Sequence, residues 1–133
     1  MRIRCTGNRG SDLPADVLET SRNTPLAMFN LIIGKEYVVY AMKLAVYGLS
    51  VMVVSGDPPR PYWNPIDLFD VLDGSIPDNW EFTRVKDHQW IRALWGYKSL
   101  IHDSNHHDDL INRKIHARDA FLRDCNLSSL EDA

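Results

Sequence analysis

Residues 30–56 read NLIIGKEYVVYAMKLAVYGLSVMVVSG and contain two runs rich in Val, Tyr and Met, at 36–44 and 49–55. β-Branched and aromatic residues favour strands, and two such runs on either side of a turn are typical of a hairpin. The turn falls in AVYG, residues 45–48, where Gly48 can take a positive φ at no steric cost. We therefore predict an antiparallel β-hairpin at the centre of the fold.

Both faces of this predicted hairpin are apolar. In the first strand, alternation places Val38, Tyr40, Met42 and Leu44 on one face and Tyr37, Val39 and Ala41 on the other. In the second, Leu49, Val51 and Val53 oppose Met52 and Val54. A sheet that is apolar on both faces needs cover on both. Another part of the chain, or a second protein, must therefore lie on the second face.

The C-terminal third of the chain offers that cover. Apolar residues recur at helical spacing in 87–102, with Asp87 as a plausible N-cap, and a second apolar stripe follows from Leu110 to Cys125. Asp108 and Asp109 stand at its start, where a helix dipole favours anions. We predict two helices within 86–126 that form a hairpin packed on the sheet.

The N-terminal part is predicted to be mainly β up to residue 85. MRIRC alternates apolar and basic residues as a half-exposed strand does, and an irregular loop follows over 6–30. Within that loop, PADVLETS at 14–21 could form a short helix capped by Asp12. The expected fold is a single α+β domain over 1–133, either a small bent antiparallel sheet or an SH3-like partial barrel with a C-terminal two-helix hairpin.

Composition narrows the classes of function. The chain has 133 residues, a formal net charge of −3 and a pI near 5.9, which disfavours nucleic-acid binding because that requires a basic face. Cys5 and Cys125 are far apart in sequence, and we predict that they are free thiols of a cytoplasmic protein. No segment resembles a signal peptide or a membrane span, so we expect no membrane partner.

The stretch HDSNHHDD, residues 102–109, concentrates histidine and aspartate side chains that could bind a metal. Imidazole and carboxylate are ligand types for zinc, but Asp, Ser and Asn in succession favour a turn. We therefore expect a polar loop between helices and no cofactor. The alternative is a small metal-binding or metal-dependent enzyme domain. Its ligands would be His102, His106, His107 and Asp109.

Signatures of catalysis are weak elsewhere. GLSVM at 48–52 lacks the second glycine of a nucleophile elbow, and neither GxGxxG nor GxxxxGK(S/T) occurs. No sequence feature raises the pKa of one carboxyl group above another in the acidic segment that follows the hairpin. We therefore expect a protein that is not an enzyme.

That acidic segment, residues 57–87, holds seven of the eighteen acidic residues and three basic ones, a local net charge of −4 (3 − 7). We predict that it forms a docking face for a basic protein partner, because complementary charge speeds association. The expected contact residues are Asp67, Asp70, Asp73, Asp78, Trp80 and Glu81. The expected packing residues are Trp63, Leu68, Phe69, Val71, Leu72 and Trp80. The sequence leaves open whether the two tryptophans pack in the core or contact the partner, and we favour the core for Trp63 and the partner for Trp80.

IIGKEYVVYAM at 32–42 and YWNPIDLFDVLDG at 62–74 resemble a known group of proteins. Their pattern is similar to that of the small SH3-like β domains of bacteria, many of which are immunity proteins of toxin–immunity systems. The resemblance covers about residues 30–85 and rests on Gly34, Lys35, Tyr37, Pro65, Leu68 and Phe69. It implies an inhibitor that binds a cognate toxin, here a basic toxin domain, and blocks its active site without a cofactor.

A third hypothesis is a structural subunit of a homo-oligomer. If the second face of the 36–55 hairpin lacked cover within its own chain, it could pair with a second copy. The sequence leaves monomer and dimer both open.

Overall fold

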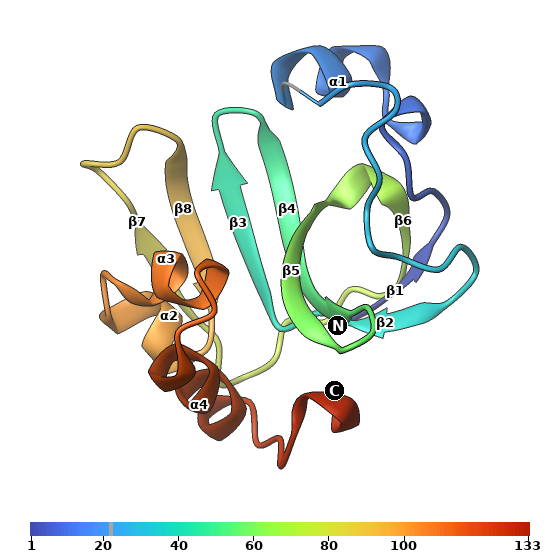
Figure 1. Ribbon diagram of the computed structural model, residues 1–133. Helices are drawn as coiled ribbons and strands as arrows, with labels where there is room; N and C mark the ends of the chain where they lie inside the picture. The colour runs from blue at the N-terminus through green and yellow to red at the C-terminus, as the bar shows by residue number, and fades with distance from the viewer. Residues whose placement is uncertain (22) are drawn as a thin grey trace.

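The computed structural model describes residues 1–21 and 23–133, and their fold belongs to the predicted α+β class (Figure 1). The strands form two antiparallel sheets, where a single bent sheet or partial barrel was expected. The three-stranded sheet has the order β2–β1–β6, formed by Glu36–Val38, Arg2–Cys5 and Phe69–Asp73. The five-stranded sheet has the order β5–β4–β3–β8–β7, formed by Arg60–Pro65, Gly48–Ser55, Ala41–Ala45, Ile91–Gly96 and Glu81–Arg84.

The helices lie at two separate places. α1 (Ala15–Ser21) belongs to the N-terminal loop, whereas α2 (Lys98–His102), α3 (His106–Ile111) and α4 (Ile115–Asp124) gather beside the five-stranded sheet, away from the three-stranded one (Figure 1). Short 3₁₀ turns occur at Gly10–Asp12, Ile66–Leu68 and Leu130–Asp132. Among the described residues, no helix has the length and apolar character needed to cross a membrane.

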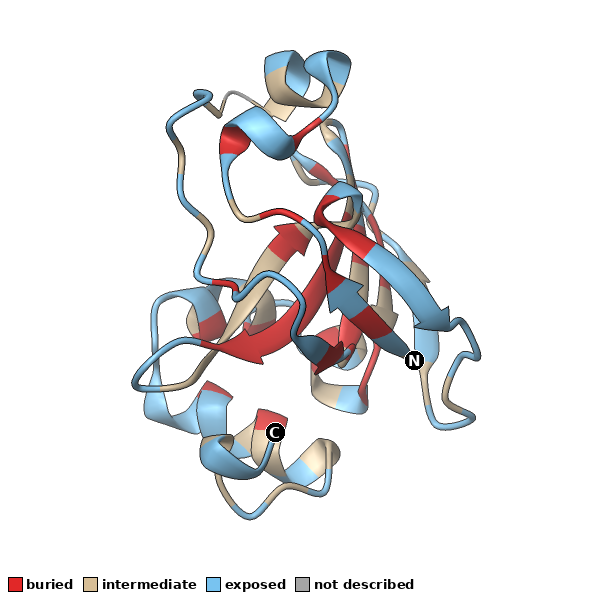
Figure 2. Cartoon of the chain, turned by 90° about the vertical axis from the view of Figure 1, so that its right-hand side faces the viewer, coloured by how far each residue is buried: buried red, intermediate tan, exposed pale blue. Residues whose placement is uncertain are grey.

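The predicted hairpin is confirmed at the centre of the larger sheet. β3 and β4 pair antiparallel from Ala41 opposite Met52 to Ala45 opposite Gly48, and Gly48 has a φ of 122°. Both faces are covered, as their apolar character requires. Val51 and Val53 of β4 belong to an N-terminal core with the three-stranded sheet, and Met52 belongs to a C-terminal core with the helices. Figure 2 shows the run of buried residues along these strands.

Cover on the second face comes from the chain itself. Leu110, Ala117 and Phe121 of α3 and α4 are buried in the same core as Ala41 and Met52. Phe121 meets Tyr40 and Tyr97 edge to face, with ring centroids 5.4 Å apart in each pair. The homo-oligomer hypothesis assumed that this face was bare, so its basis is removed.

The predicted strand over 36–44 is wrong in its continuity. It divides at residues 39–40 into β2, in the smaller sheet, and β3, in the larger one. The N–H of Val39 donates to the carbonyl of Met1, whereas the next N–H, of Tyr40, donates to the carbonyl of Met52. The chain therefore passes from one sheet to the other between two adjacent residues, with both amides satisfied.

The predicted helix over 87–102, with Asp87 as its N-cap, is also wrong. Residues 91–96 form β8, which pairs with both β3 and β7. Pairing with β3 places Gly96 opposite Ala41, and a Cβ on Gly96 would lie 2.9 Å from the Cβ of Ala41. Without β8, β3 would have an unpaired edge, and this tertiary requirement overrides the helical spacing of the apolar residues.

The C-terminal two-helix hairpin is replaced by the three helices α2, α3 and α4. The predicted polar loop is shorter than expected, because only residues 103–105 lie between α2 and α3, and His106 begins α3. The predicted placement of Asp108 and Asp109 in the first turn of a helix is confirmed.

The N-terminal predictions are largely confirmed. Ile3 and Cys5 are buried on β1 while Arg2 and Arg4 are exposed, and a short helix does follow the first loop. The role predicted for Asp12 is wrong: its carboxylate accepts the N–H groups of Asn8 and Arg9 at 3.0 and 3.1 Å and closes the preceding turn.

In the 57–87 segment, Leu68 and Phe69 are buried as predicted. Val71 and Leu72, expected to pack, are exposed instead, because β6 is an edge strand of a three-stranded sheet.

Candidate functional site

The structure divides the predicted acidic docking residues between two sheets. Asp70 and Asp73 lie on β6, opposite Arg4 and Arg2 of β1 in the strand register. Glu81 lies on β7 of the other sheet, and its carboxylate is 2.8 Å from Nε2 of His102. The remaining two acids lie outside the strands: Asp67 in the 3₁₀ turn before β6, and Asp78 in the loop before β7. The acidic residues therefore do not share one face of one sheet.

The two tryptophans of this segment pack against different cores. Trp80, predicted to contact a partner, is half-buried against the N-terminal core. Trp63, predicted to be a core residue, is half-buried against the C-terminal core. Its indole stacks on the ring of His107, with centroids 5.8 Å apart and planes inclined by 30°.

The residues of the alternative metal site have separate partners. His102 contacts Glu81, and Asp109 contacts His116 at 2.9 Å. His106 is buried, with Nε2 2.7 Å from the hydroxyl of Tyr97. Within residues 1–21 and 23–133, no three His, Cys, Asp or Glu side chains are grouped as metal ligands would be. This arrangement gives the metal-binding alternative no support.

A cavity of about 350 Å³ lies between the five-stranded sheet and the C-terminal helices. Its sheet-side wall comes from β3, β4 and β5, and its helix-side wall from α3, α4 and the turn between them. The apolar or aromatic lining residues are Met52, Pro61, Tyr62, Trp63, Leu110, Ile111, Ile115 and Leu130. We call this feature the cationic pocket, for the reason that follows.

Among the residues that the structure describes, every charged one that lines the pocket is basic. These residues are Lys43, Arg60, Arg113, Lys114 and Arg118. Arg118 lies 3.4 Å from Asp119, whereas Arg60, Arg113 and Lys114 have no carboxylate within ion-pair distance among the described residues. α4 also begins at this wall, directly after Lys114, and the N-terminus of a helix favours an anion. The lining of the pocket is therefore basic, although the chain as a whole is acidic.

The turn that presents Arg113 and Lys114 has a well-defined geometry. Arg113 has a φ of 60°, in the left-handed region, and the N–H of Lys114 donates to the carbonyl of Asp109 at 2.9 Å. A residue in this conformation and such a six-to-one hydrogen bond are typical of a helix C-terminus, where glycine is the usual residue. An arginine in this position costs about 1 kcal/mol of folding free energy. Here that residue adds a guanidinium to the pocket wall.

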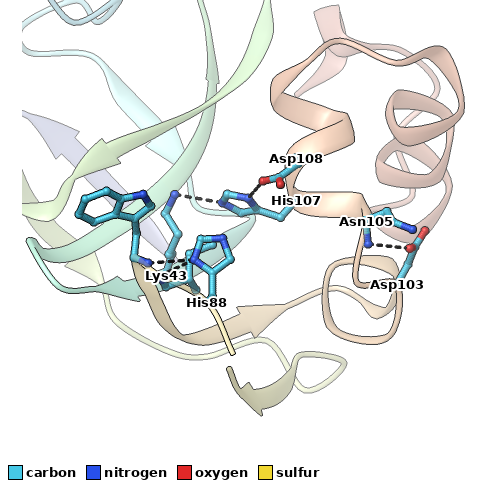
Figure 3. Close-up of polar contacts among 8 residues, drawn as sticks. Lys43, His88, Asp103, Asn105, His107 and Asp108 are labelled. Atoms are coloured by element: carbon cyan, nitrogen blue, oxygen red, sulfur yellow. Dashed lines mark hydrogen bonds and ion pairs between the residues drawn. The ribbon is translucent and has the colours of Figure 1, made fainter. Parts of the chain in front are cut away.

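Lys43 is the most buried charge of the pocket. It lies on β3, only 4% exposed, with Nζ 4.6 Å from the centre of the Trp63 indole. Nζ is also 3.1 Å from Nε2 of His107, and Nδ1 of His107 is 2.8 Å from the carboxylate of Asp108 (Figure 3). Because an ammonium group can only donate, it fixes the His107 tautomer that donates from Nδ1 to Asp108.

Burial changes the proton affinity of both groups. Loss of solvent lowers the pKa of Lys43 to about 8, against a smaller opposing effect of Asp108. Burial also lowers the pKa of His107, and the neighbouring Lys43 charge lowers it further. Near neutral pH the pair therefore consists of a neutral imidazole beside an amine close to its own titration point.

Comparison of the chain with family models, with curated proteins and with solved structures found no match. The geometry described above is therefore the basis for assigning a function.

Proposed function

We propose that this protein binds a small organic anion, a carboxylate or a phosphate attached to a flat or apolar group, in the cationic pocket. The supporting observation is a cavity with aromatic and aliphatic walls, whose charged lining, over residues 1–21 and 23–133, consists of five basic side chains and no carboxylate. Basic groups left without counter-charges in a concave site bind an anion through charge-assisted hydrogen bonds.

The size of the pocket favours a small-molecule ligand. About 350 Å³ lies at the lower end of the range for small-molecule sites. Such a volume suits a single ring with one or two charged groups. The aromatic side chains of Tyr62 and Trp63 provide flat surfaces for the ring, and the arginines provide planar pairs of donors for the anion.

Calorimetric titration with phenyl phosphate tests the proposal. Arg60→Gln and Lys114→Gln should each weaken binding roughly tenfold, because each removes one charge-assisted partner. Lys98→Gln removes an exposed positive charge that does not line the pocket, and this matched control should bind as the wild type does. Equal losses in all three variants would contradict the proposal, since they would show only a general charge effect.

The immunity-type inhibitor remains a second candidate, and one observation favours it. β6 is an edge strand on which Val71 is 55% exposed and Leu72 is 41% exposed, with Asp70 and Asp73 on the same strand. An exposed edge with both apolar and acidic residues suits the addition of a strand from a basic partner, such as a toxin domain. The resemblance to SH3-like immunity proteins belongs to this second proposal.

Replacing Asp70 and Asp73 by Asn tests the second candidate. Both side chains are exposed, so the fold should be unchanged. Association with a basic partner captured from the native cell should slow and should depend less on salt. Unchanged association at both low and high salt would contradict the acidic-face proposal and would leave the pocket proposal unaffected.

A further inference from the structure

We propose that Lys43 is a carbonyl-reactive lysine, whose Nζ condenses with an aldehyde or ketone group on the anion bound in the cationic pocket. The inference rests on the proposed function, because the anion must be bound before its carbonyl can reach Lys43. It adds a chemical class to the ligand: a keto acid, an aldehyde acid or an aromatic aldehyde phosphate.

The position of Lys43 supports this reactivity. The residue lines the cavity although it is only 4% exposed, so a ligand that enters the cavity meets it on a wall with little access to bulk water. Its immediate neighbour in the hydrogen-bonded series Lys43–His107–Asp108 is a neutral imidazole, and the carboxylate of Asp108 lies on the far side of that ring. A buried amine without a direct carboxylate partner is more easily deprotonated, and the lowered pKa agrees with this.

The neighbouring residues provide a route for the proton. His107 Nε2, 3.1 Å from Nζ, can take the ammonium proton in passing and release it to water, because the pKa of His107 is itself lowered, and this leaves the amine free to react. The carboxylate of Asp108, 2.8 Å from the other ring nitrogen, stabilises the imidazolium that results. Lys43 is thus the reacting residue, whereas His107 and Asp108 act through it.

The condensation balances without a further reactant. The Nζ lone pair of the neutral amine forms a bond to the carbonyl carbon, and the carbonyl π pair moves to the oxygen. One proton passes from the nitrogen to that oxygen and gives a carbinolamine. The carbon–oxygen bond then breaks, the nitrogen gives up its second proton, and water leaves as the carbon–nitrogen double bond of an imine forms. One amine and one carbonyl yield one imine and one water, with no net oxidation or reduction, and the reaction is reversible.

Reductive trapping tests the inference on the wild-type protein. We would incubate the protein at pH 7.5 with pyridoxal 5′-phosphate as probe and sodium cyanoborohydride as trapping reagent, and then map modified lysines by peptide mass spectrometry. Lys35, Lys86 and Lys98 are exposed and serve as internal references. The lowered pKa of Lys43 leaves part of its amine neutral at this pH, inside the pocket that holds the phosphate of the probe, so Lys43 should be modified at least about tenfold faster than each reference. Modification of the references while Lys43 stays intact would overturn the inference.

Lys114 is the competing pocket lysine, because it lines the same cavity but is exposed. Modification of Lys114 in place of Lys43 would also overturn the inference.

Two variants distinguish the chemical reactivity of Lys43 from its position in the pocket. Lys43→Arg keeps the charge and should abolish labelling at position 43, so that any label left in the pocket is on Lys114. His107→Gln keeps Lys43 but should slow its labelling several-fold by removing the proton acceptor. Labelling of Lys43 at an unchanged rate in His107→Gln would contradict the role given to that residue.

Phenyl phosphate, which has no carbonyl group, makes failure of this inference distinguishable from failure of the proposed function. If phenyl phosphate binds and an excess of it protects Lys43 from labelling, the proposed function and the inference are both supported. If it binds but Lys43 is never labelled, the pocket function stands and the carbonyl chemistry is wrong. If it does not bind, the proposed function is wrong and the inference fails with it.

Discussion

The ammonium nitrogen of Lys43 lies 3.1 Å from Nε2 of His107, so a residue of the central hairpin is joined to one on α3, 64 positions away in sequence. Trp63 of β5 closes this arrangement, because its ring lies against both the Lys43 amine and the His107 imidazole. The sheet and the helical layer therefore meet at a titratable pair on the wall of the pocket. The protonation state of that pair affects folding stability as well as ligand binding.

The first prediction concerns stability at alkaline pH. The pKa of Lys43 is about 8 in the folded protein, below its ordinary value of 10.5. Between these values the unfolded chain holds a proton that the folded one has released, so this group makes stability rise with pH. The free energy of unfolding of the wild type, relative to that of Lys43→Met, should rise by up to about 1.4 kcal/mol for each pH unit above 8.

Urea denaturation of both proteins from pH 7 to 10 measures this difference. The buried tyrosines and Cys125 have raised pKa values in the fold and act in the opposite direction, but they are present in both proteins and cancel. Parallel stability curves for the two proteins would show that Lys43 is not a buried cation.

The second prediction concerns acid. Burial lowers the pKa of both His106 and His107, so each resists protonation in the fold more than in the unfolded chain. The unfolded chain therefore binds more protons below about pH 6.5, and stability should fall as pH drops through this range. His106→Gln and His107→Gln should each lose stability at pH 7 but show a flatter dependence on pH. Melting temperatures from pH 7.5 to 5 check this, with His102→Gln as the matched loss of an exposed imidazole.

The third prediction separates stability from binding at Arg113. Arg113→Gly removes a left-handed arginine at a helix end and should stabilise the fold by about 1 kcal/mol, while weakening anion binding roughly tenfold. Arg113→Ala keeps the left-handed side-chain strain but loses the charge, so it should weaken binding equally without the gain in stability. If the Gly variant is no more stable than the Ala variant, the described turn is wrong.

The fourth prediction concerns β8. Leu94 is 6% exposed in the C-terminal core, on a strand paired on both sides. Leu94→Ala should lower the free energy of unfolding by about 2–5 kcal/mol, and Leu94→Asp should prevent folding, because it buries an unpaired charge. Leu44→Asp, at a position 39% exposed on β3, is the control and should be tolerated far better. A well-folded fragment ending at Val85 would also contradict this account, since it lacks β8 and the helices.

The central hairpin and its need for cover on both faces could be predicted because alternation along 49–55 is a local property of the sequence. β8 could not, because Ile91, Leu94 and Trp95 satisfy helical spacing while Ile91 and Ala93 also satisfy strand alternation. Whether these residues form a helix or a strand depends on the edge of β3 that β8 pairs with, and that edge exists only in the folded sheet. The same holds for the exposed Val71 and Leu72, since the sequence does not show that β6 lies at a sheet edge.

The pocket was missed for a similar reason. Its basic residues stand at positions 43, 60, 113, 114 and 118, and only the fold brings them together. The local net charge of −4 favoured residues 57–87 as the binding site instead. The structure divides the acidic strand residues of that segment between two sheets. One local signal was present: Lys43 is a single charge in the apolar run YAMKLAV, on the buried side of its strand.

The most direct test of the account compares benzoate with benzamide, two ligands of nearly the same shape that differ in charge. Calorimetric titration of the wild type at low salt should show benzoate binding at least about tenfold more tightly than benzamide, because only the carboxylate can pair with the basic residues of the pocket. Added salt should reduce that difference. Equal affinities for the two ligands, or no binding of either, would contradict the account.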